Sequence, residues 1–144
     1  MMNKKKRTFS SGHFIALVFL VLALFVTAVL VVKRVQTSEE SICRYVTRHQ
    51  QELSEFLALP TEEYNHWQVK QWQLQSGETY SVFSVHAFGL APSGHERGFV
   101  HLPQTPKSST LSPMEDGWRW QDGGDNNGVL KHIVGNWYYF EWEW

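Results

Sequence analysis

The sequence predicts an α+β domain that follows an N-terminal transmembrane helix. Three patterns support this fold class: one long apolar run near the start, one amphipathic helical segment after it, and a series of alternating strand-like segments separated by Gly and Pro. A helix followed by hairpin-connected strands is typical of an antiparallel sheet with the helix on one face. We therefore expect an N-terminal transmembrane helix, then one amphipathic helix packed on an antiparallel β-sheet of about 4–6 strands.

The apolar run covers residues 14–32 and contains a single polar side chain, that of Thr27. A helix of this length spans about 28 Å, close to the hydrocarbon thickness of a bilayer. A signal peptide is the main alternative, because Val26-Thr27-Ala28 offers a small residue for cleavage. Four further apolar residues follow that point, so the run is longer than a typical signal-peptide core. We expect an uncleaved single-pass anchor, a signal-anchor that contacts the lipid bilayer through residues 14–32.

Basic residues flank the anchor and predict its orientation. Residues 4–7 are Lys-Lys-Lys-Arg, whereas only Lys33 and Arg34 follow the apolar run directly. The excess of positive charge before the helix favours a cytoplasmic tail at residues 1–13 and a small domain at residues 33–144 outside the cell membrane. The distance from the anchor to the next helix is short in sequence, so we expect this domain to lie near the membrane surface.

The domain is acidic and has a single cysteine. Beyond Val35 the chain has seven basic residues and all 14 of its acidic ones, a net charge of −7. This charge repels a phosphate backbone, and we expect no nucleic-acid partner. Cys43 has no second cysteine to pair with, and we expect it to pack as a small apolar side chain.

The amphipathic helix begins after the anchor, where Thr37 and Glu40 have capping-box spacing, and Pro60 ends it near Ala58. Its apolar face recurs at three- and four-residue intervals: Ile42, Tyr45, Val46, His49, Leu53, Phe56 and Leu57.

The rest of the chain alternates like strands with turns between them. We expect a first hairpin with strands at residues 66–75 and 79–90 and a turn at 76–78. A short strand at 99–102, a polar loop at 104–113, a strand beginning at 118–120 and a turn at 122–128 should follow. The last element is a hairpin with strands at 129–134 and 137–144 around Gly135-Asn136.

Metal and catalytic signatures are weak. The Asp- and Gly-rich segment at residues 122–128 fails the spacing of an EF-hand, and no HExxH, CxxC or GxSxG motif occurs. We expect no cofactor, no metal and no catalytic residue, and a protein that is more an accessory than an enzyme. An enzyme remains the alternative if scattered side chains converge in space, namely those of His86, His101, His132 and Asp125.

Aromatic residues concentrate in the last strand. Alternation places Tyr138, Phe140, Trp142 and Trp144 on one face, and we expect this set to form the core beneath the helix. Trp137 and Tyr139 then lie on the other face, half exposed. Together with Trp118 and Trp120 they are the candidate binding residues, since exposed aromatic rings stack on sugars, grip peptides or rest at a lipid interface.

Several Gly and aromatic positions between residues 80 and 140 form a recognisable series: Phe88-Gly89-Leu90-Ala91-Pro92-Ser93, Arg97-Gly98-Phe99, Gly117-Trp118-Arg119-Trp120, Gly124-Asp125-Asn126 and Asn136-Trp137-Tyr138-Tyr139. This series resembles a family of uncharacterised small membrane-anchored proteins of clostridia-like Gram-positive bacteria. The resemblance implies a membrane-anchored domain and assigns no activity or site residues.

These observations predict a single-pass membrane-anchored accessory or binding protein that binds a cell-envelope ligand or another membrane protein. The first alternative is an envelope hydrolase or metal-dependent enzyme built from scattered His and Asp side chains. The second is a subunit of a larger membrane complex, although residues 14–32 have no small-xxx-small pattern for helix pairing.

Overall fold

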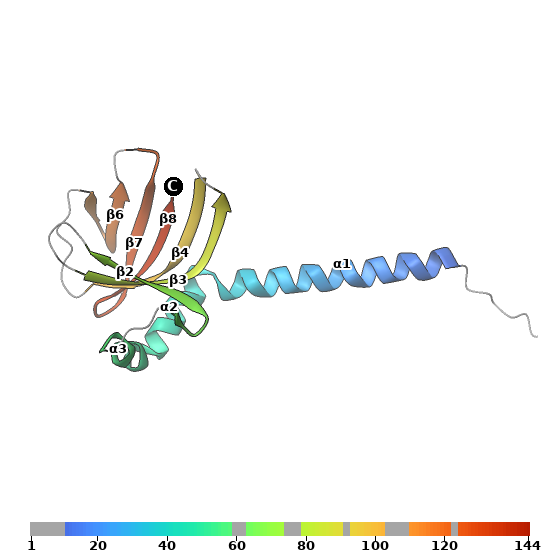
Figure 1. Cartoon of the computed structure of the whole chain (residues 1–144), viewed down its shortest axis with the longest axis horizontal. Coiled ribbons are helices and arrows are strands. Elements are labelled where there is room, and N and C mark those ends of the chain that lie inside the picture. Colours follow the sequence, from blue (N-terminus) through green and yellow to red (C-terminus); the bar gives the residue numbers. More distant parts are fainter. Residues whose placement is uncertain (1–10, 59–62, 74–78, 91–92, 103–109, 122–123) are drawn as a thin grey trace, which may run out of the picture. The chain divides into compact units, whose positions relative to one another are not determined.

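The structure is a computed structural model that describes residues 11–58, 63–73, 79–90, 93–102, 110–121 and 124–144. The described residues form an α+β fold of three helices and eight strands (Figure 1). The elements are α1 (Ser11–Gln36), α2 (Glu39–Arg48), α3 (Gln50–Ala58), β1 (Glu63–Tyr64), β2 (Trp67–Gln73), β3 (Thr79–Leu90), β4 (Ser93–His101), β5 (Leu111–Met114), β6 (Gly117–Gln121), β7 (Asn127–Val134) and β8 (Trp137–Glu143).

Helix α1 is long and apolar enough to span a membrane, over Phe14–Gln36. Within this helix the large apolar side chains are exposed. The hydroxyl of Thr27 donates a hydrogen bond to the carbonyl of Ala23 at 2.8 Å, within the helix itself. The chain divides into two compact units, Met1–Val35 and Gln36–Trp144.

The amphipathic segment forms two short helices instead of the single predicted one. Ser38, not Thr37, is the N-cap of α2, and its hydroxyl accepts the backbone N–H of Ser41 at 3.3 Å. His49 ends α2 with φ −109° and ψ 19°, outside the helical range. The predicted apolar face nevertheless holds across the break, because Ile42 and Val46 of α2 are buried with Leu53 of α3.

The strands form one antiparallel sheet in the order β1-β2-β3-β4-β8-β7-β6-β5. Eight strands exceed the four to six expected, and two of the differences have clear causes. The short strand predicted at 99–102 is part of a longer one, because β4 starts at Ser93 and pairs with β3 through Gly94 and Gly98. The predicted loop at 104–113 ends in β5, whose Pro113 is tolerated because β5 lies at the sheet edge. The turn predicted at 76–78 lies outside the described residues, as do residues 122 and 123 of the turn predicted at 122–128. The last two residues of that predicted turn, Asn127 and Gly128, belong to strand β7.

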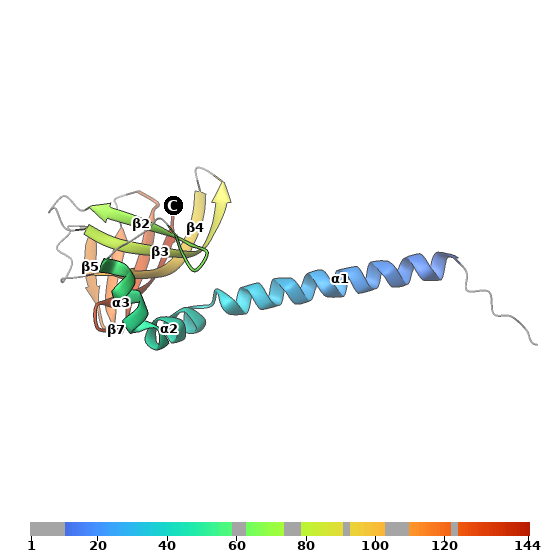
Figure 2. The same ribbon diagram turned by 60° about the horizontal axis from the view of Figure 1, so that its bottom comes forward.

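Both faces of the sheet are apolar, and each has its own core cluster. On the outer face α2 and α3 cover a cluster that includes Val69, Phe83, Phe99, Trp137 and Tyr139. On the inner face a second cluster contains Tyr80, Val82, Val100, Leu102, Leu130, Phe140 and Trp142. Figures 1 and 2 show β2 and β3 crossing in front of β6 and β7, so that the sheet curls around its inner face.

The assignment of faces in β8 is the reverse of the prediction. Trp137 and Tyr139 lie under the helices, 1% and 0% exposed, whereas Phe140 and Trp142 belong to the inner face. The alternation itself is confirmed by the burial pattern and by the hairpin with β7, in which Val134 pairs with Trp137 around Gly135 and Asn136. A strand with large apolar residues on both faces does not indicate which face the helix will cover.

Candidate functional site

An apolar cavity lies inside the curl of the sheet. Its volume is about 100 Å³. Among the described residues it is lined by Trp72, Tyr80, Val82, Val100, Leu102, Thr110, Leu111, Trp120, Leu130 and Trp142, and we call it the inner cavity. An engineered apolar cavity of about 150 Å³ in another protein stays dry and binds benzene. The inner cavity therefore suits a group of a few carbon atoms.

Three tryptophans make up much of its wall. The rings of Trp72 and Trp142 are stacked, with centroids 4.4 Å apart and planes at 15°. Trp120 lies 6.2 Å from Trp142, between ring centroids, at an angle of 47°. Since β2 and β8 are not neighbours in the sheet, the stack of Trp72 on Trp142 joins strands across the curl.

A glycine opposite Trp142 makes room for its ring. Gly128 of β7 is the register partner of Trp142. A Cβ atom at position 128 would lie 2.3 Å from Cδ1 of Trp142 and 2.6 Å from the carbonyl oxygen of Glu141. Real side chains do not approach that closely, so any other residue would displace the indole or the strand.

The indole N–H of Trp142 has no hydrogen-bond acceptor in the described part of the chain. Trp142 is only 8% exposed, and its Nε1 atom is buried without a partner. A buried Trp N–H usually finds an acceptor, and leaving such a donor unpaired costs about 1–3 kcal/mol. The packing around Trp142 thus encloses one unsatisfied donor, and its nitrogen has almost no surface accessible to a water-sized atom.

An ion pair lies next to Trp142 on the inner face. Glu96 of β4 is the register partner of Trp142 and is 4% exposed. Lys70 reaches across from β2, and its Nζ atom donates to Oε1 of Glu96 at 3.0 Å. The ammonium group compensates the charge of the buried carboxylate.

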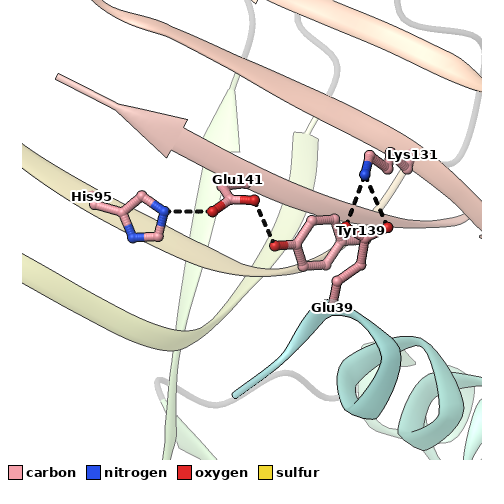
Figure 3. Close-up of polar contacts among 5 residues, drawn as sticks. All are labelled: Glu39, His95, Lys131, Tyr139 and Glu141. Atoms are coloured by element: carbon pink, nitrogen blue, oxygen red, sulfur yellow. Dashed lines mark hydrogen bonds and ion pairs between the residues drawn. The ribbon is translucent and has the colours of Figure 1, made fainter. Parts of the chain in front are cut away.

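The outer face has two separate groups of polar contacts, and one of them, between Glu39 and Lys131, joins helix α2 to the sheet (Figure 3). Nε2 of His95 and the hydroxyl of Tyr139 lie 2.7 and 3.0 Å from the carboxylate oxygens of Glu141. Burial alone would raise the pKa of Glu141, but hydrogen bonds from His95 and Tyr139 outweigh it and hold the pKa below its usual value. Lys131 of β7 donates to both oxygens of Glu39 on α2, at 3.0 and 2.8 Å.

The histidines considered for a metal site are spread over the domain. The rings of His86 and His95 are 6.5 Å apart on the outer face, whereas His101 packs on Trp137 and His132 on Tyr138. Asp125 lines an open hollow of about 600 Å³, which it shares with Ser93, Gly94, His95, Asn126, Glu143 and Trp144. Within the described ranges, no group of three or more His, Cys, Asp or Glu side chains is arranged to hold a metal ion.

The four predicted binding residues fall into two groups. Trp137 and Tyr139 are buried beneath the helices, so their rings present no surface to solvent. Trp120 lines the inner cavity, and Trp118 packs against the inner cluster.

Two wall residues, Trp72 and Trp142, were not selected from the sequence as binding candidates. The available signal was the alternation in their strands, which places Trp72 with Lys70 and Trp142 with Phe140 on the inner face. Recognising a cavity there also requires knowledge of the curl, which a single strand does not encode.

Comparisons with protein-family models, with curated proteins and with solved structures found no match to this chain. The resemblance to small anchored proteins of Gram-positive bacteria therefore stays a prediction.

Proposed function

We propose that the chain is a single-pass membrane-anchored binding protein whose domain takes a small apolar group into the inner cavity. The observation that carries this proposal is the cavity itself, about 100 Å³ in volume and walled by aromatic and aliphatic side chains. Ligand sites are typically concave and mostly apolar, with few polar groups. A non-enzymatic role is consistent with this lining, which supplies neither a nucleophile–base pair nor a metal-ligand set among the described residues.

The anchor part of the proposal rests on α1. Its length and apolar surface suit a bilayer, and Lys4 to Arg7 favour a cytoplasmic N-terminus with the domain outside the cell membrane. Only Thr37 and Ser38 separate α1 from α2 along the chain. A domain on so short a tether meets molecules that concentrate at the lipid surface, including apolar and amphipathic ones from the cell envelope.

The test uses the full chain in lipid nanodiscs and a small apolar probe. The probe is 2-methylpent-1-ene, a small alkene with the shape of methyl propyl ketone but with a CH₂ group in place of the carbonyl oxygen. Because all seven tryptophans follow residue 66 and three of them line the cavity, binding should change the intrinsic fluorescence saturably. Binding to the folded state should also raise the unfolding temperature as the probe concentration increases.

A cavity-filling variant makes this test specific. Val100→Phe adds a ring to a wall position that is 2% exposed, and we expect it to lose measurable probe binding while the domain stays folded. The matched control is Val85→Phe, the same change at a half-buried outer position, which should bind like the wild type. Unchanged binding in Val100→Phe, or no saturable signal in the wild type, would contradict the proposal.

A further inference from the structure

We propose that the open hollow beside Trp144 is a second binding site, which takes an uncharged sugar ring. The hollow is separate from the inner cavity, because the two share none of their described lining residues. The inference therefore does not depend on the proposed function. The volume of the hollow, about 600 Å³, lies within the range of about 300–1,000 Å³ that small-molecule sites occupy.

The first step is that Trp144 forms a fixed aromatic surface. Alternation along the last strand predicts this residue in the core, but it is 41% exposed. Its backbone is held against Gly94 of β4, because each of the two residues donates its N–H to the carbonyl of the other, at 2.6 and 3.1 Å.

The indole of Trp144 lies flat on that glycine. A Cβ atom at position 94 would be 2.6 Å from Cε2 and 2.7 Å from both Cζ2 and Nε1 of Trp144. Since the middle one of these three consecutive ring atoms is the nearest, the point lies over the ring and not beside its edge. The indole is thus supported from one side by the backbone of β4, and its exposed part lines the hollow.

The second step is that polar side chains surround this aromatic surface. Asp125 and Glu143 are exposed and supply carboxylate oxygens, while Asn126 supplies an amide that both donates and accepts. The sheet register brings them together, since Glu143 lies opposite His95 on one side and Asn127 on the other. A sugar ring has the matching two parts: C–H groups that pack on an indole, and hydroxyl groups that bond carboxylates and amides.

The third step concerns the charge of the ligand. The described lining of the hollow contains two carboxylates, those of Asp125 and Glu143, and no lysine or arginine. His95 is already engaged with Glu141 at 2.7 Å. A sugar acid would add a negative charge with no cation to compensate it, in a domain with seven basic and 14 acidic residues. The hydroxyl groups of an uncharged sugar are instead donors that these carboxylates accept.

An organic cation is the other ligand that carboxylates attract. Quaternary ammonium groups are typically bound in cages of several aromatic rings. Trp144 is the single Trp, Tyr or Phe in the described lining, so the hollow offers one aromatic surface and no cage. One aromatic surface with hydrogen-bonding groups around it suits a flat ring better than a spherical cation.

Neutral sugar rings have two sources at a membrane: oligosaccharides of the surroundings and headgroups of glycolipids. The composition of a lipid nanodisc separates them. Discs of phosphatidylcholine contain no sugar, so a response to an added trisaccharide reports a ring from solution. Discs that include glucosyl diacylglycerol present a ring from the bilayer with no sugar added.

The experiment follows the indole ¹H–¹⁵N signal of Trp144 in the full chain, assigned by its loss in Trp144→Phe. The probes are cellotriose, mannotriose and chitotriose in phosphatidylcholine discs, and glucosyl diacylglycerol in the disc itself. At least one of these neutral sugars should shift the signal saturably. Sorbitol, which has hydroxyl groups but no ring, and the acidic trigalacturonate should not. The inference is overturned if no neutral sugar shifts the signal, or if sorbitol or trigalacturonate binds as tightly.

Calorimetric titration of variants with the responding sugar tests the residues. Trp144→Ala should lower the affinity by about tenfold or more, as loss of a central aromatic contact does. Asp125→Asn/Glu143→Gln should lower it by about threefold to tenfold and should raise the affinity for trigalacturonate. The matched control is Phe88→Ala, because Phe88 is 77% exposed but lies outside the lining of the hollow, and it should bind like the wild type.

The two proposed sites fail independently of each other. Val100→Phe fills the inner cavity and should leave sugar binding unchanged, whereas Trp144→Ala should leave the binding of 2-methylpent-1-ene unchanged. Wild-type sugar affinity in Trp144→Ala refutes the sugar site alone. Failure of 2-methylpent-1-ene to bind the wild type refutes the proposed function alone.

Discussion

At the scale of single residues, the inner face combines an apolar wall with one ion pair. The Glu96 side chain is 5% exposed and the Lys70 side chain 34%. Water can therefore solvate the ammonium group in part, whereas the carboxylate relies on the ammonium group to compensate its charge. Loss of the cation leaves a buried charge without compensation, whereas loss of both groups leaves an apolar surface that can repack. Removing one partner is therefore expected to destabilise the domain more than removing both.

This asymmetry predicts how a single and a double variant differ from the wild type. Lys70→Met should lower the free energy of unfolding by about 2 kcal/mol, less than the 3–5 kcal/mol typical of fully buried pairs because Lys70 is partly exposed. The double variant Lys70→Met/Glu96→Met should lose less than Lys70→Met alone. Chemical denaturation of the full chain in nanodiscs measures all three free energies.

The matched control is the exposed ion pair of α2, between Arg44 and Glu40, whose side chains are 53% and 82% exposed. Arg44→Met should change the free energy of unfolding by no more than about 0.5 kcal/mol. If Lys70→Met proves as mild as Arg44→Met, Glu96 does not depend on its partner in the way described.

Two histidines make the stability of the domain depend on pH. Burial lowers the pKa of His101 below its usual 6.5, and burial together with Arg97 and His95 lowers the pKa of His86. Between each lowered pKa and 6.5 the unfolded chain binds a proton that the folded domain does not, so stability rises with pH there. The stability that the two neutral imidazole rings contribute is fully present above about pH 7. It is lost as the pH falls from 6.5 through the lowered pKa of each histidine.

We therefore expect the unfolding temperature of the full chain in nanodiscs to fall between about pH 7.5 and pH 5.5. His101→Gln should flatten this fall, while His66→Gln, at an exposed position, should leave it unchanged. The carboxyl groups with lowered pKa, Glu52 and Glu141, act below 4.5 and do not overlap this interval. Equal slopes in the wild type and in His101→Gln would contradict the role of His101.

At the scale of elements, the sequence was informative wherever local patterns decide the structure. The hairpin of β7 and β8 followed from Gly135-Asn136 between apolar runs, and the buried face of α2 and α3 followed from helical spacing. Both features depend on residues close together in the chain. The break at His49 was missed because nothing in the apolar spacing marks it.

The missed strands have a different cause. Strand β4 contains Gly94 and Gly98, which usually indicate turns, but Gly98 lies where a Cβ would be 1.9 Å from the carbonyl oxygen of Phe83. The glycine permits close approach of β3 near the register shift between Ser84 and His86. The need for glycine at position 98 is visible only once β3 is placed beside β4. In the sequence of β4 alone, the same glycine indicates a break in the strand.

The candidate site was the least predictable feature for the same reason. Its wall takes residues from β2 through β8, and Trp72 meets Trp142 only because the sheet curls. The sequence showed an aromatic-rich domain and a final strand with two apolar faces. It could not show that both faces are buried, one by helices and the other by the sheet itself.

At the scale of the whole molecule, charge is divided between the two parts of the chain. Six basic residues flank the apolar run, while the remainder from Val35 onward has a net charge of −7. Positive charges before a membrane helix retain that side in the cytoplasm, whereas acidic residues have little influence on orientation. The proposal that the domain lies outside thus depends mainly on residues 4–7.

This dependence gives a direct test by reporter fusions at the C-terminus. With the wild-type chain, fused alkaline phosphatase should be active and fused green fluorescent protein dark, as for an external C-terminus. Replacing all four of Lys4, Lys5, Lys6 and Arg7 by Gln leaves Lys33 and Arg34 as the dominant charges, and we expect part or all of the population to invert. Replacing Lys33 and Arg34 by Gln is the matched control and should leave the C-terminus outside. A fluorescent wild-type fusion would place the domain in the cytoplasm and remove envelope molecules as ligands, while leaving the inner cavity to be tested against small apolar molecules of the cytoplasm.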